Sequence, residues 1–566
     1  MAADRLLYVG IHIGHDRSVS VVENGTLVGH LAEERVDRVK HSRSVAFPRR
    51  SLDVLARSLG FLLEQVSAFA ITYAFVDMDT LGPHLIADFR AEFDLPDATV
   101  FCMGHHLAHA YSTFFTSPFR DAAILVADGA GDLAGQYLEA ESAYRASPDG
   151  IEQIWSRPQD LPSSDVQRRN FFCMPYMGEW DRPKQISFAR KYEQFTYALN
   201  FGWGQSGKTM GLAAWGTPLF GPPAHALNPP DFPLSMADMM AELEELRAAS
   251  GMSFGRFVRE RAKDVAATAQ SAVEGMVLAV CKHVRELSPS DNLCLAGGLF
   301  LNCVLNHKIV REAGFKNVHI VPACGDDGQS IGAAYFACER SEGRLIPGLV
   351  SPYQGPEPKP QAAWAAIEAA GLGGVARILD NESLVAEIVA RLQEGRTVGL
   401  CRGRSEMGPR ALGHRSILAS PTDPRMHAHM NRYVKHREDF RPLAPMVRWE
   451  DQFSIFELAA PSPHMLLTAQ VRSEWKERIP AVTHIDGSAR VQAVRQEDEP
   501  FLHRLLTIMG MQTGVPVLMN TSLNNRGEPI VETPAEALAM LHRSALDAVV
   551  VENILVDRDQ RRRSCP

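Results

Sequence analysis

The segment His-His-Leu-Ala-His at residues 105–109 has the spacing that most directly suggests chemistry. His105 and His109 are four residues apart, so on a helix they lie on one face and can chelate one divalent ion. His106 faces another direction, and because it is not a glutamate the segment is not the HExxH motif of zinc proteases. A polar helix face would show the same spacing, so both interpretations of the pair stay open.

Two acidic glycine turns supply the carboxylates that a metal site would need. Asp128 lies in VADGAGD at the end of a predicted strand, and Asp326 lies in CGDDG after the predicted strand NVHIVPA. Glycines let the backbone approach a ligand, and carboxylates at strand ends suit metal or phosphate sites. Two histidines with two carboxylates favour iron, manganese or zinc over magnesium, which prefers oxygen ligands alone. Either aspartate taken alone is equally well explained by an Asx turn.

Two further turns carry candidate functional residues. His15, with Asp16, follows the first predicted strand at a turn, where an imidazole can take the proton of a substrate hydroxyl. Gly297-Gly298 follows a short predicted strand and precedes Asn302, and such a turn lets backbone amides contact a nucleotide. A structural turn is the alternative for each of them.

Residues 202–209, GWGQSGKT, match the P-loop pattern GxxxxGK[ST] letter by letter. A P-loop must follow a buried strand and open a long helix. Here the preceding YEQFTYALNF has helical spacing, and the following segment is broken by Gly216 and Pro218. We therefore do not expect a P-loop at this position.

The window 401–450 reverses the charge of the chain. It contains ten lysines and arginines against five acids, a local balance near +5 in a protein of formal net charge −9. Four segments, 403–421, 431–445, 483–494 and 519–531, each bring Arg or Lys beside Gly, Ser or Asn. This pattern fits a site for several phosphate or carboxylate oxygens, which the arginine fork binds bidentately. Ion-paired surface arginines are the alternative for any one of them.

The elements that position these residues indicate an α/β fold with a mixed sheet. The first strands form a hairpin around Asn24-Gly25, a strong turn signal, and glycine turns separate later strands from helices. A Pro/Gly-rich linker at 346–361 places a domain boundary near residues 350–380. The expected elements are helices at 50–70, 262–288 and 382–394, two strands within 121–139, and strands at 292–298, 316–322 and 397–401.

Composition limits the class of protein. A chain of 566 residues, 45% hydrophobic and 22% charged, is globular and too long for one domain. The acidic net charge argues against binding nucleic acid or an anionic membrane as the main activity. Nine scattered cysteines without a CxxC pair predict reduced thiols in the cytoplasm. Neither a signal peptide nor an apolar run of eighteen residues is evident, so we expect no export and no membrane span.

Taken together, the motifs resemble the O-carbamoyltransferase family of antibiotic and nodulation-factor biosynthesis. Eleven stretches within residues 10 to 531 carry the resemblance in the expected order. They are GHDRSVSVV, AEERVDRVKH, HHLAHA, VADGAGD, GKTMGLAAWG, AGGLFLN, GDDGQSIGAA, EMGPRALGHRSILA, KHREDFRPLAP, HIDGSARVQ and NTSLNNRGEPIV.

The resemblance implies two domains of α/β class. Residues 1–360 would form an actin/Hsp70-like (ASKHA) carbamoyl-transfer domain with mixed sheets and a metal site, and residues 361–566 a YrdC-like domain that makes carbamoyl-adenylate. The implied partners are carbamoyl phosphate, ATP with Mg²⁺, and a hydroxylated small molecule as acceptor. No nucleic acid or membrane partner is expected, and a homodimer is compatible. The resemblance favours Fe²⁺ at the metal site, with Mn²⁺ or Zn²⁺ as alternatives.

The resemblance also assigns roles to individual residues. His15 would be the base for the acceptor hydroxyl, with Lys40 as a second candidate near the transferred group. The implied metal ligands are His105, His109, Asp128 and Asp326, the last preferred over Asp327. The nucleotide of the adenylate would contact Lys208, Gly297, Gly298 and Asn302. Carbamoyl phosphate and ATP would be held by Arg410, Arg415, Lys435, Arg441, Arg490, Asn524 and Arg526.

Three features depart from the family pattern. Ser206 stands where the family usually has Glu, and Arg17 stands where many relatives have a small residue. Residues 155–200 match no motif of the family and are rich in aromatic side chains. We expect them to line the acceptor site, a packed insertion being the alternative. The aromatic residues concerned are Trp155, Phe171, Phe172, Trp180 and Tyr192.

Rival functions remain at this point. A tRNA threonylcarbamoyl-type transferase is disfavoured by the acidic charge and the fused second domain, and a hydrogenase-maturation carbamoyltransferase by the absence of CxxC pairs. An ASKHA small-molecule kinase, or a chaperone ATPase of that class, would need neither the histidine pair nor the GPRALGHRS segment.

Overall fold

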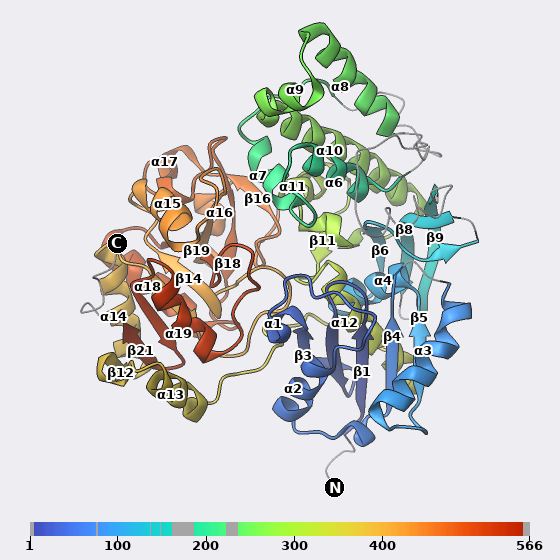
Figure 1. Ribbon diagram of the computed structural model, residues 1–566, viewed down its shortest axis with the longest axis horizontal. Coiled ribbons are helices and arrows are strands. Elements are labelled where there is room, and N and C mark those ends of the chain that lie inside the picture. Colours follow the sequence, from blue (N-terminus) through green and yellow to red (C-terminus); the bar gives the residue numbers. More distant parts are fainter. Residues whose placement is uncertain are drawn as a thin grey trace. The chain divides into compact units, whose positions relative to one another are not determined.

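The computed structural model describes residues 5–74, 77–135, 137–147, 149–160, 186–221 and 236–558 (Figure 1). The chain divides into two compact units. Unit 1 comprises Met1–Val28, Arg43–Pro48 and Leu62–Val350, and unit 2 comprises Gly29–Ser42, Arg49–Phe61 and Ser351–Pro566. The units are thus discontinuous in sequence, whereas the domains predicted at 1–360 and 361–566 are continuous.

The first sheet begins with the predicted hairpin. Its strand order is β3-β2-β1-β4-β5, in which β1 is antiparallel to β2 and parallel to β4, and β4 is parallel to β5. Asn24 and Gly25 have φ values of 49° and 79°, the left-handed pair that a tight hairpin turn requires. The strands are β1 (Leu7–His12), β2 (Ser18–Glu23), β3 (Thr26–Ala32), β4 (Ala68–Thr72) and β5 (Val100–Met103).

The second sheet has the order β11-β10-β6-β8-β7, and β9 pairs with β8. Strands β6, β10 and β11 are parallel, whereas β8 is antiparallel to β6. The carboxyl ends of β6, β10 and β11 therefore lie at one edge, where open α/β sheets commonly bind ligands. The strands are β6 (Ala122–Ala127), β7 (Leu133–Ala134), β8 (Tyr137–Ser147), β9 (Gly150–Asp160), β10 (Asn292–Ala296) and β11 (Asn317–Ile320).

Helix α12 packs closely against the first sheet and against α4. A Cβ atom at Gly10 of β1 would lie 1.9 Å from the Ser330 carbonyl oxygen, and one at Gly332 would lie 1.9 Å from that of Ala108. Only glycine allows backbones to approach so closely. The helices of unit 1 are α3 (Met78–Phe93), α4 (His105–Phe115), α6 (Phe188–Ala198), α7 (Ser206–Ala213), α8 (Met236–Ser250), α9 (Phe254–Glu260), α10 (Ala262–Leu287), α11 (Cys303–Glu312) and α12 (Gln329–Glu342).

Helix α10 matches the helix predicted at 262–288, and α6, α7 and α11 pack around it (Figure 1). Among the described residues it is the one helix long and apolar enough to cross a membrane by length and composition. Its most apolar window is 72% buried inside the protein, as expected of a core helix. The helix meets this test without an uninterrupted run of eighteen apolar residues, so the expectation of no membrane span stays a prediction.

Unit 2 is built on an eight-stranded mixed sheet of order β12-β21-β20-β13-β14-β19-β15-β18. A separate two-stranded sheet pairs β16 (Thr468–Gln470) with β17 (Ser488–Arg490). The strands of the large sheet are β12 (Ala376–Ile378), β13 (Val398–Cys401), β14 (Arg415–Ala419), β15 (Ala444–Arg448), β18 (Gln492–Val494), β19 (Val517–Ser522), β20 (Ala548–Val551) and β21 (Ile554–Asp557).

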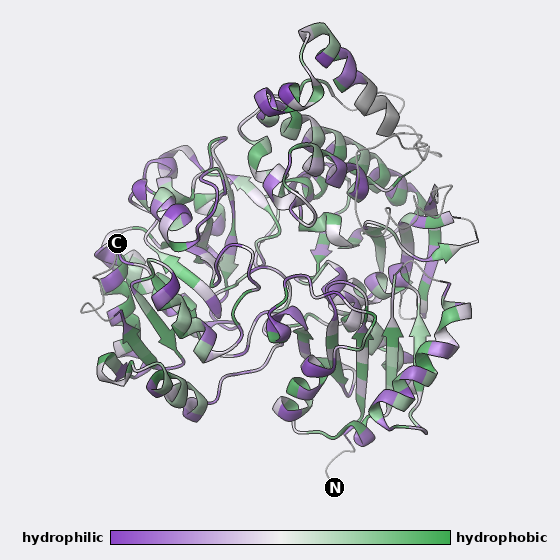
Figure 2. Cartoon of the chain, in the orientation of Figure 1, coloured by the Kyte–Doolittle hydropathy of each residue, from purple (hydrophilic) through white to green (hydrophobic). Residues whose placement is uncertain are grey.

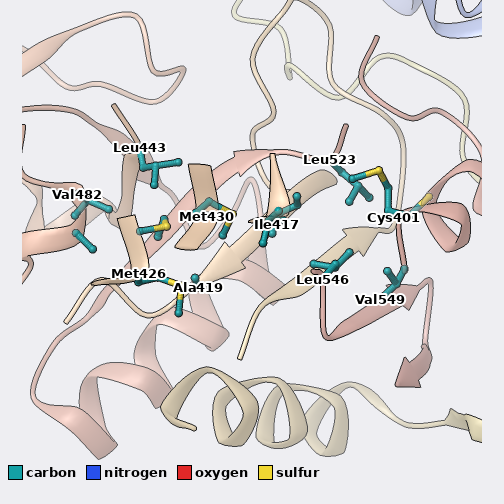
Figure 3. Packing of buried hydrophobic residues seen from close by; sticks show 14 of the residues in the cluster. Cys401, Ile417, Ala419, Met426, Met430, Leu443, Val482, Leu523, Leu546 and Val549 are labelled. Carbon is teal, nitrogen blue, oxygen red and sulfur yellow. The ribbon is translucent and has the colours of Figure 1, made fainter. Parts of the chain in front are cut away.

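Both faces of the inner strands β13, β14 and β20 are buried, and the hydropathy colouring shows apolar strands in this unit (Figure 2). Successive residues alternate between two cores: Ile417 and Ala419 pack in one, shown in Figure 3, and Leu418 packs in the other. This is the period-2 pattern of a strand covered on both faces. The helices of unit 2 are α1 (Glu34–Asp37), α2 (Arg49–Leu59), α13 (Pro360–Ala369), α14 (Asn381–Gln393), α15 (Arg425–His429), α16 (Gln452–Ile455), α17 (Ser473–Lys476), α18 (Pro500–Thr513) and α19 (Pro534–Arg543).

The mixed α/β class and the mixed sheets of the N-terminal part are confirmed. One predicted helix, at 50–70, was too long, because α2 ends at Leu59. Gly60 has a φ of 68°, the left-handed conformation that commonly terminates a helix. The apolar residues that follow enter a short 3₁₀ turn and then β4, so their helical spacing misled the prediction.

Candidate functional site

Helix α4 presents the histidine pair to a buried cluster in unit 1. It starts directly after β5 through Gly104, and the backbone N–H of His105 donates to the carboxylate of Asp132 at 2.7 Å. The side chains of His105 and His109 are fully buried, and their Nε2 atoms lie 3.0 and 3.2 Å from the same oxygen, Oδ2 of Asp128. The predicted helical pair is therefore confirmed as one face directed at a carboxylate.

The two predicted aspartates come from strand ends of the second sheet. Asp128 follows β6, and Asp326 opens the 3₁₀ turn Asp326–Gly328 after β11. Asp326 Oδ1 lies 3.2 Å from His109 Nε2 and 3.5 Å from His105 Nε2. One ligand atom from each of His105, His109, Asp128 and Asp326 lies within 4.8 Å of the others. The four predicted metal ligands therefore form one cluster, called here the imidazole–carboxylate cluster.

The electrostatics of this cluster suit a divalent cation. Burial would raise the pKa of Asp128, but hydrogen bonds and charge interactions with the two histidines hold it well below its usual value. Burial would lower the pKa of His109, yet its contacts with Asp128 and Asp326 raise that pKa to about 9. Two carboxylates held together this deeply require positive charge, which a divalent ion supplies with neutral imidazoles. The residues present thus fit a metal ion such as iron, manganese or zinc.

His15 lies beside this cluster rather than apart from it. Its Nε2 is 3.1 Å from Asp326 Oδ2, and its Nδ1 is 3.0 Å from Asp16 Oδ2. Burial would lower the pKa of His15, but Asp326 and Asp16 raise it to about 9. With that pKa both ring nitrogens carry protons near pH 7, so His15 can accept a proton from a substrate only after it has lost one of its own.

The turn that holds His15 is fixed by its backbone. Gly14 has a φ of 113°, and the Gly14 N–H donates to the Ser44 carbonyl at 2.9 Å. The buried ring of His12 contacts the His15 carbonyl through Nε2 at 3.1 Å. Sequence reasoning did not single out His12, because a histidine inside a buried strand gives no spacing signal.

The residues assigned to the adenylate lie near Asp128 or on the helical part of unit 1. The N–H of Gly298 donates to Asp128 Oδ1 at 3.3 Å, and Gly297 has a φ of 105°. Asn302 caps α11 and exchanges hydrogen bonds with Gln270 of α10, at 3.0 and 3.2 Å. Lys208 is buried on α7, with its Nζ 5.6 Å from the centre of the Phe201 ring. The Gly-Gly turn therefore borders the cluster, and the Asn302 amide is engaged within the helices.

The P-loop pattern at 202–209 has the surroundings expected of a chance match. It follows helix α6 rather than a strand, and α7 ends at Ala213.

Two of the aromatic residues proposed for the acceptor site lie among the described residues. Tyr192 is buried and its hydroxyl donates to the side-chain oxygen of Gln270, and the ring of Trp155 contacts the ring of His283. Phe171, Phe172 and Trp180 lie outside the described residues.

Unit 2 gathers cationic side chains into a second cluster, called here the basic cluster. Burial, then the charge of neighbouring arginines, lowers the pKa of Arg437 and of Arg441. The interacting neighbours are Lys435, Arg410, Arg490 and Arg526. Glu438 partly offsets their charge, 3.9 Å from Arg441 and 3.4 Å from Arg526. Mutual repulsion of this kind is relieved when an anion binds.

Five residues assigned to carbamoyl phosphate and ATP meet in the basic cluster, and Arg437 joins them. Arg437 was missed because its predicted segment already contained Lys435 and Arg441. Its Nε donates to Oδ1 of Asn431 at 2.7 Å, and Nδ2 of Asn431 donates to the Arg441 carbonyl at 3.0 Å. The buried Lys435 ammonium donates to the carbonyl and side-chain oxygens of Asn524, at 2.6 and 2.5 Å, so Asn524 borders the same cluster.

Arg415 and Lys40 differ from the other assigned residues. Arg415 is fully buried, and its guanidinium donates to the carbonyls of Gly403 and Glu532 at 3.0 and 3.1 Å. Those bonds pair the Arg415 guanidinium with backbone groups of the protein itself. Lys40 is exposed and belongs to unit 2, where its charge acts on Lys435.

Comparison with known proteins matches both parts of the chain. A family model described as Carbamoyltransferase N-terminus matches residues 87–335, and one described as Carbamoyltransferase C-terminus matches residues 389–558. An uncharacterised protein of Synechocystis sp. is 31% identical over 619 residues, covering 96% of this chain and 95% of that protein. Nodulation protein NolNO of Sinorhizobium fredii is 31% identical over 574 residues, covering 96% of this chain and 79% of that protein. A crystal structure of full-length HypF in a phosphate- and nucleotide-bound form is 13% identical, with a TM-score of 0.42 over 60% of this chain and 57% of that one.

These matches define the class as enzymes of carbamoyl transfer. The chain belongs to the carbamoyltransferase family, in the kind represented by nodulation protein NolNO. The resemblance predicted from the eleven sequence motifs is thereby confirmed.

Proposed function

We propose that the protein is an O-carbamoyltransferase that makes carbamoyl-adenylate and transfers its carbamoyl group to a hydroxyl of a small-molecule natural product. In the first step, carbamoyl phosphate, ATP and water give carbamoyl-adenylate, phosphate and pyrophosphate. The acceptor oxygen then attacks the carbamoyl carbon, AMP leaves and the hydroxyl proton is released. We further propose a cytoplasmic enzyme, which the free thiols of the described cysteines support.

The observation that carries the proposal is the imidazole–carboxylate cluster beside His15. A divalent metal at this cluster would offset negative charge as AMP departs. The residues that would hold it are His105, His109, Asp128 and Asp326. The N–H of Gly298 and the neighbouring Gly297 offer backbone to the adenylate next to Asp128. His15, once it has lost a proton and its contact with Asp326 or Asp16, would take the acceptor proton.

The basic cluster of unit 2 suits the first step. Arg410, Arg437, Arg441 and Arg490 can hold phosphate oxygens of carbamoyl phosphate and of ATP through their fork geometry. Mg²⁺ would accompany ATP. Carbamoyl-adenylate is a mixed anhydride that water destroys, so making it in the protein that consumes it limits its loss. Family membership favours carbamoyl transfer over the phosphoryl transfer of a kinase.

The decisive experiment follows the fate of ATP. With carbamoyl phosphate present, purified protein should convert ATP to AMP and pyrophosphate, with or without a hydroxylated acceptor. Formation of ADP instead would contradict the adenylate mechanism. Arg441→Ala should lose pyrophosphate formation, and Arg504→Ala, which removes an exposed arginine paired with Glu382 on another part of unit 2, is the matched control.

A further inference from the structure

Helix α6 turns a polar face toward the imidazole–carboxylate cluster. Arg190, Glu193 and Tyr197 are spaced three and four residues apart, so they share one face of the helix. Phe188 and Phe195, on other faces, are buried at 1% exposure each. The apolar side therefore anchors the helix, and the three polar side chains lie together on a separate face.

Two contacts locate this polar face beside the reacting groups. Arg190 Nε donates to the Gly129 carbonyl at 2.8 Å, one residue after Asp128. Glu193 Oε1 accepts from the Gly204 N–H at 3.5 Å, which ties α6 to the turn that carries Trp203. Charge interactions link Glu193 to His15 as well as to Arg190 and Arg43. The polar face thus borders the side of the cluster on which His15 lies.

Trp203 completes the group. Its ring lies edge to face with His15, with ring centres 5.7 Å apart, and the Arg43 guanidinium sits 3.4 Å above it. Arg43 is exposed, so this cation–π contact leaves its N–H groups available to a ligand. We call Arg43, Arg190, Glu193, Tyr197 and Trp203 the α6 cluster.

One member of this cluster has an unmet hydrogen-bonding need. Within the described part of the chain, the buried hydroxyl of Tyr197 has no hydrogen-bond partner. A buried hydroxyl without a partner is unfavourable, and a ligand that pairs with it removes that penalty. Burial raises the pKa of the neighbouring Glu193, although the charges of Arg190 and His15 oppose that shift. A ligand that both donates and accepts hydrogen bonds would satisfy both groups.

The charges decide between classes of ligand. A carboxylate and a phosphate only accept hydrogen bonds, so the phosphate of the AMP part of the intermediate cannot pair with Glu193. Two guanidinium groups, those of Arg43 and Arg190, outnumber that one carboxylate and repel an ammonium group. Hydroxyl groups meet neither objection, because each donates to a carboxylate and accepts from a guanidinium or a phenol.

We infer that the α6 cluster is the acceptor-recognition site, and that it selects an uncharged, polyhydroxylated acceptor over an aminated one. This inference rests on the proposed function. Arg43, Glu193 and Tyr197 bind hydroxyl groups of the acceptor, and Trp203 contacts its ring. These residues would bring one hydroxyl to His15.

The test uses acceptors in matched pairs. Methyl glucoside is compared with methyl 2-amino-2-deoxyglucoside, and methyl galactoside with its 2-amino counterpart, in carbamoyl transfer with carbamoyl phosphate and ATP. The uncharged member should have at least a tenfold higher kcat/KM in each pair. Preference for the aminated members, or transfer to neither member of any pair, would overturn the inference. ATP–pyrophosphate exchange without acceptor is measured alongside, and its failure would instead identify a failure of the proposed function.

Variants test the individual contacts. Tyr197→Phe should raise KM for the uncharged acceptor about fivefold with a smaller change in kcat. Arg43→Ala, at an exposed position that should fold normally, should lower the preference for the uncharged member at least threefold. Exposed Tyr137→Phe and Arg120→Ala are the matched controls in the same unit. An unchanged KM in Tyr197→Phe together with an unchanged preference in Arg43→Ala would overturn the assignment.

Discussion

At the scale of single residues, the imidazole–carboxylate cluster is arranged around shared atoms. Oδ2 of Asp128 contacts both histidines, and Oδ1 of Asp326 contacts both again. Such sharing is unfavourable for four polar groups buried without a cation, since each carboxylate repels the other. The convergence of these four side chains is therefore better explained by binding of a metal ion than by hydrogen bonds and ion pairs among themselves.

Replacing one ligand should remove the metal. His109→Ala leaves three donors, and we expect metal affinity to fall by more than about 100-fold, beyond the roughly 10–100-fold typical of an outer-shell change. Metal content after dialysis, measured by mass spectrometry, should drop together with carbamoyl transfer. His84→Ala, at an exposed histidine of α3, should retain both. A His109→Ala protein with full metal content would refute the assignment.

A buried histidine outside both clusters should make unit 2 sensitive to acid. Burial, and then the charge of Arg35, lowers the pKa of His30 from 6.5 to about 3. Between these values the unfolded chain binds a proton that the folded chain does not, so stability is full above pH 6.5 and falls toward pH 3. The slope is about 1.4 kcal/mol per pH unit.

Urea unfolding at pH 7, 6, 5 and 4 measures this contribution. His30→Gln should lose stability less steeply on acidification than the wild type, whatever its stability at pH 7. His84→Gln should follow the wild-type slope. Identical slopes for wild type and His30→Gln would show that His30 is protonated at its ordinary pKa in the folded protein.

At the scale of elements, parallel strands and one close helix crossing bring the ligands together. Asp128, Gly297-Gly298 and Asp326 follow the neighbouring parallel strands β6, β10 and β11, so they meet at one sheet edge. His15 and His105 follow β1 and β5 of the first sheet in the same sense. Helix α12, which begins directly after Asp326–Gly328, packs against α4 at Gly332. The spacing of the two backbones thus sets where the histidines and Asp326 meet.

Enlarging Gly332 should separate these helices. The new Cβ of Gly332→Ala would lie 1.9 Å from the Ala108 carbonyl oxygen, so the backbone must move. We expect a loss of about 1–3 kcal/mol in the free energy of unfolding, with weaker metal binding. Gly255→Ala in α9, where the nearest atom is 3.6 Å away, should be neutral or slightly stabilising. Calorimetry and metal titration of both variants test this, and equal behaviour would contradict it.

Sequence reasoning succeeded where the signal was local. The i,i+4 histidines, the Asn24-Gly25 hairpin and the acidic turns are set by neighbours in the chain, and the structure confirms their local conformations. It failed where partners are distant. Nothing near Arg190 indicates that it meets the Gly129 carbonyl, because that contact depends on how α6 packs against the second sheet.

At the scale of the whole molecule, each unit combines segments that are separate in the sequence. Residues Gly29–Ser42 belong to unit 2, where Arg35 lies among groups from distant segments. It donates to the Glu406 and Val531 carbonyls at 3.3 and 3.4 Å, and its Nη1 lies 3.8 Å from Glu532. These partners lie more than 370 residues further along the chain, a separation that no local pattern encodes.

The two clusters, in separate units, predict a specific failure of complementation. The His109→Ala and Arg441→Ala proteins should fail at different steps, one at transfer and one at adenylate formation. If each protein molecule consumes the carbamoyl-adenylate that it makes, mixing the two proteins restores less than about a tenth of wild-type transfer, because the mixed anhydride is hydrolysed in bulk water. Carbamoylated acceptor is measured by mass spectrometry at equal total protein, with the mixture containing heat-inactivated Arg441→Ala as the baseline. Transfer by the mixture at the wild-type rate would mean that the intermediate diffuses freely, and the advantage of joining both activities in one chain would then need another explanation.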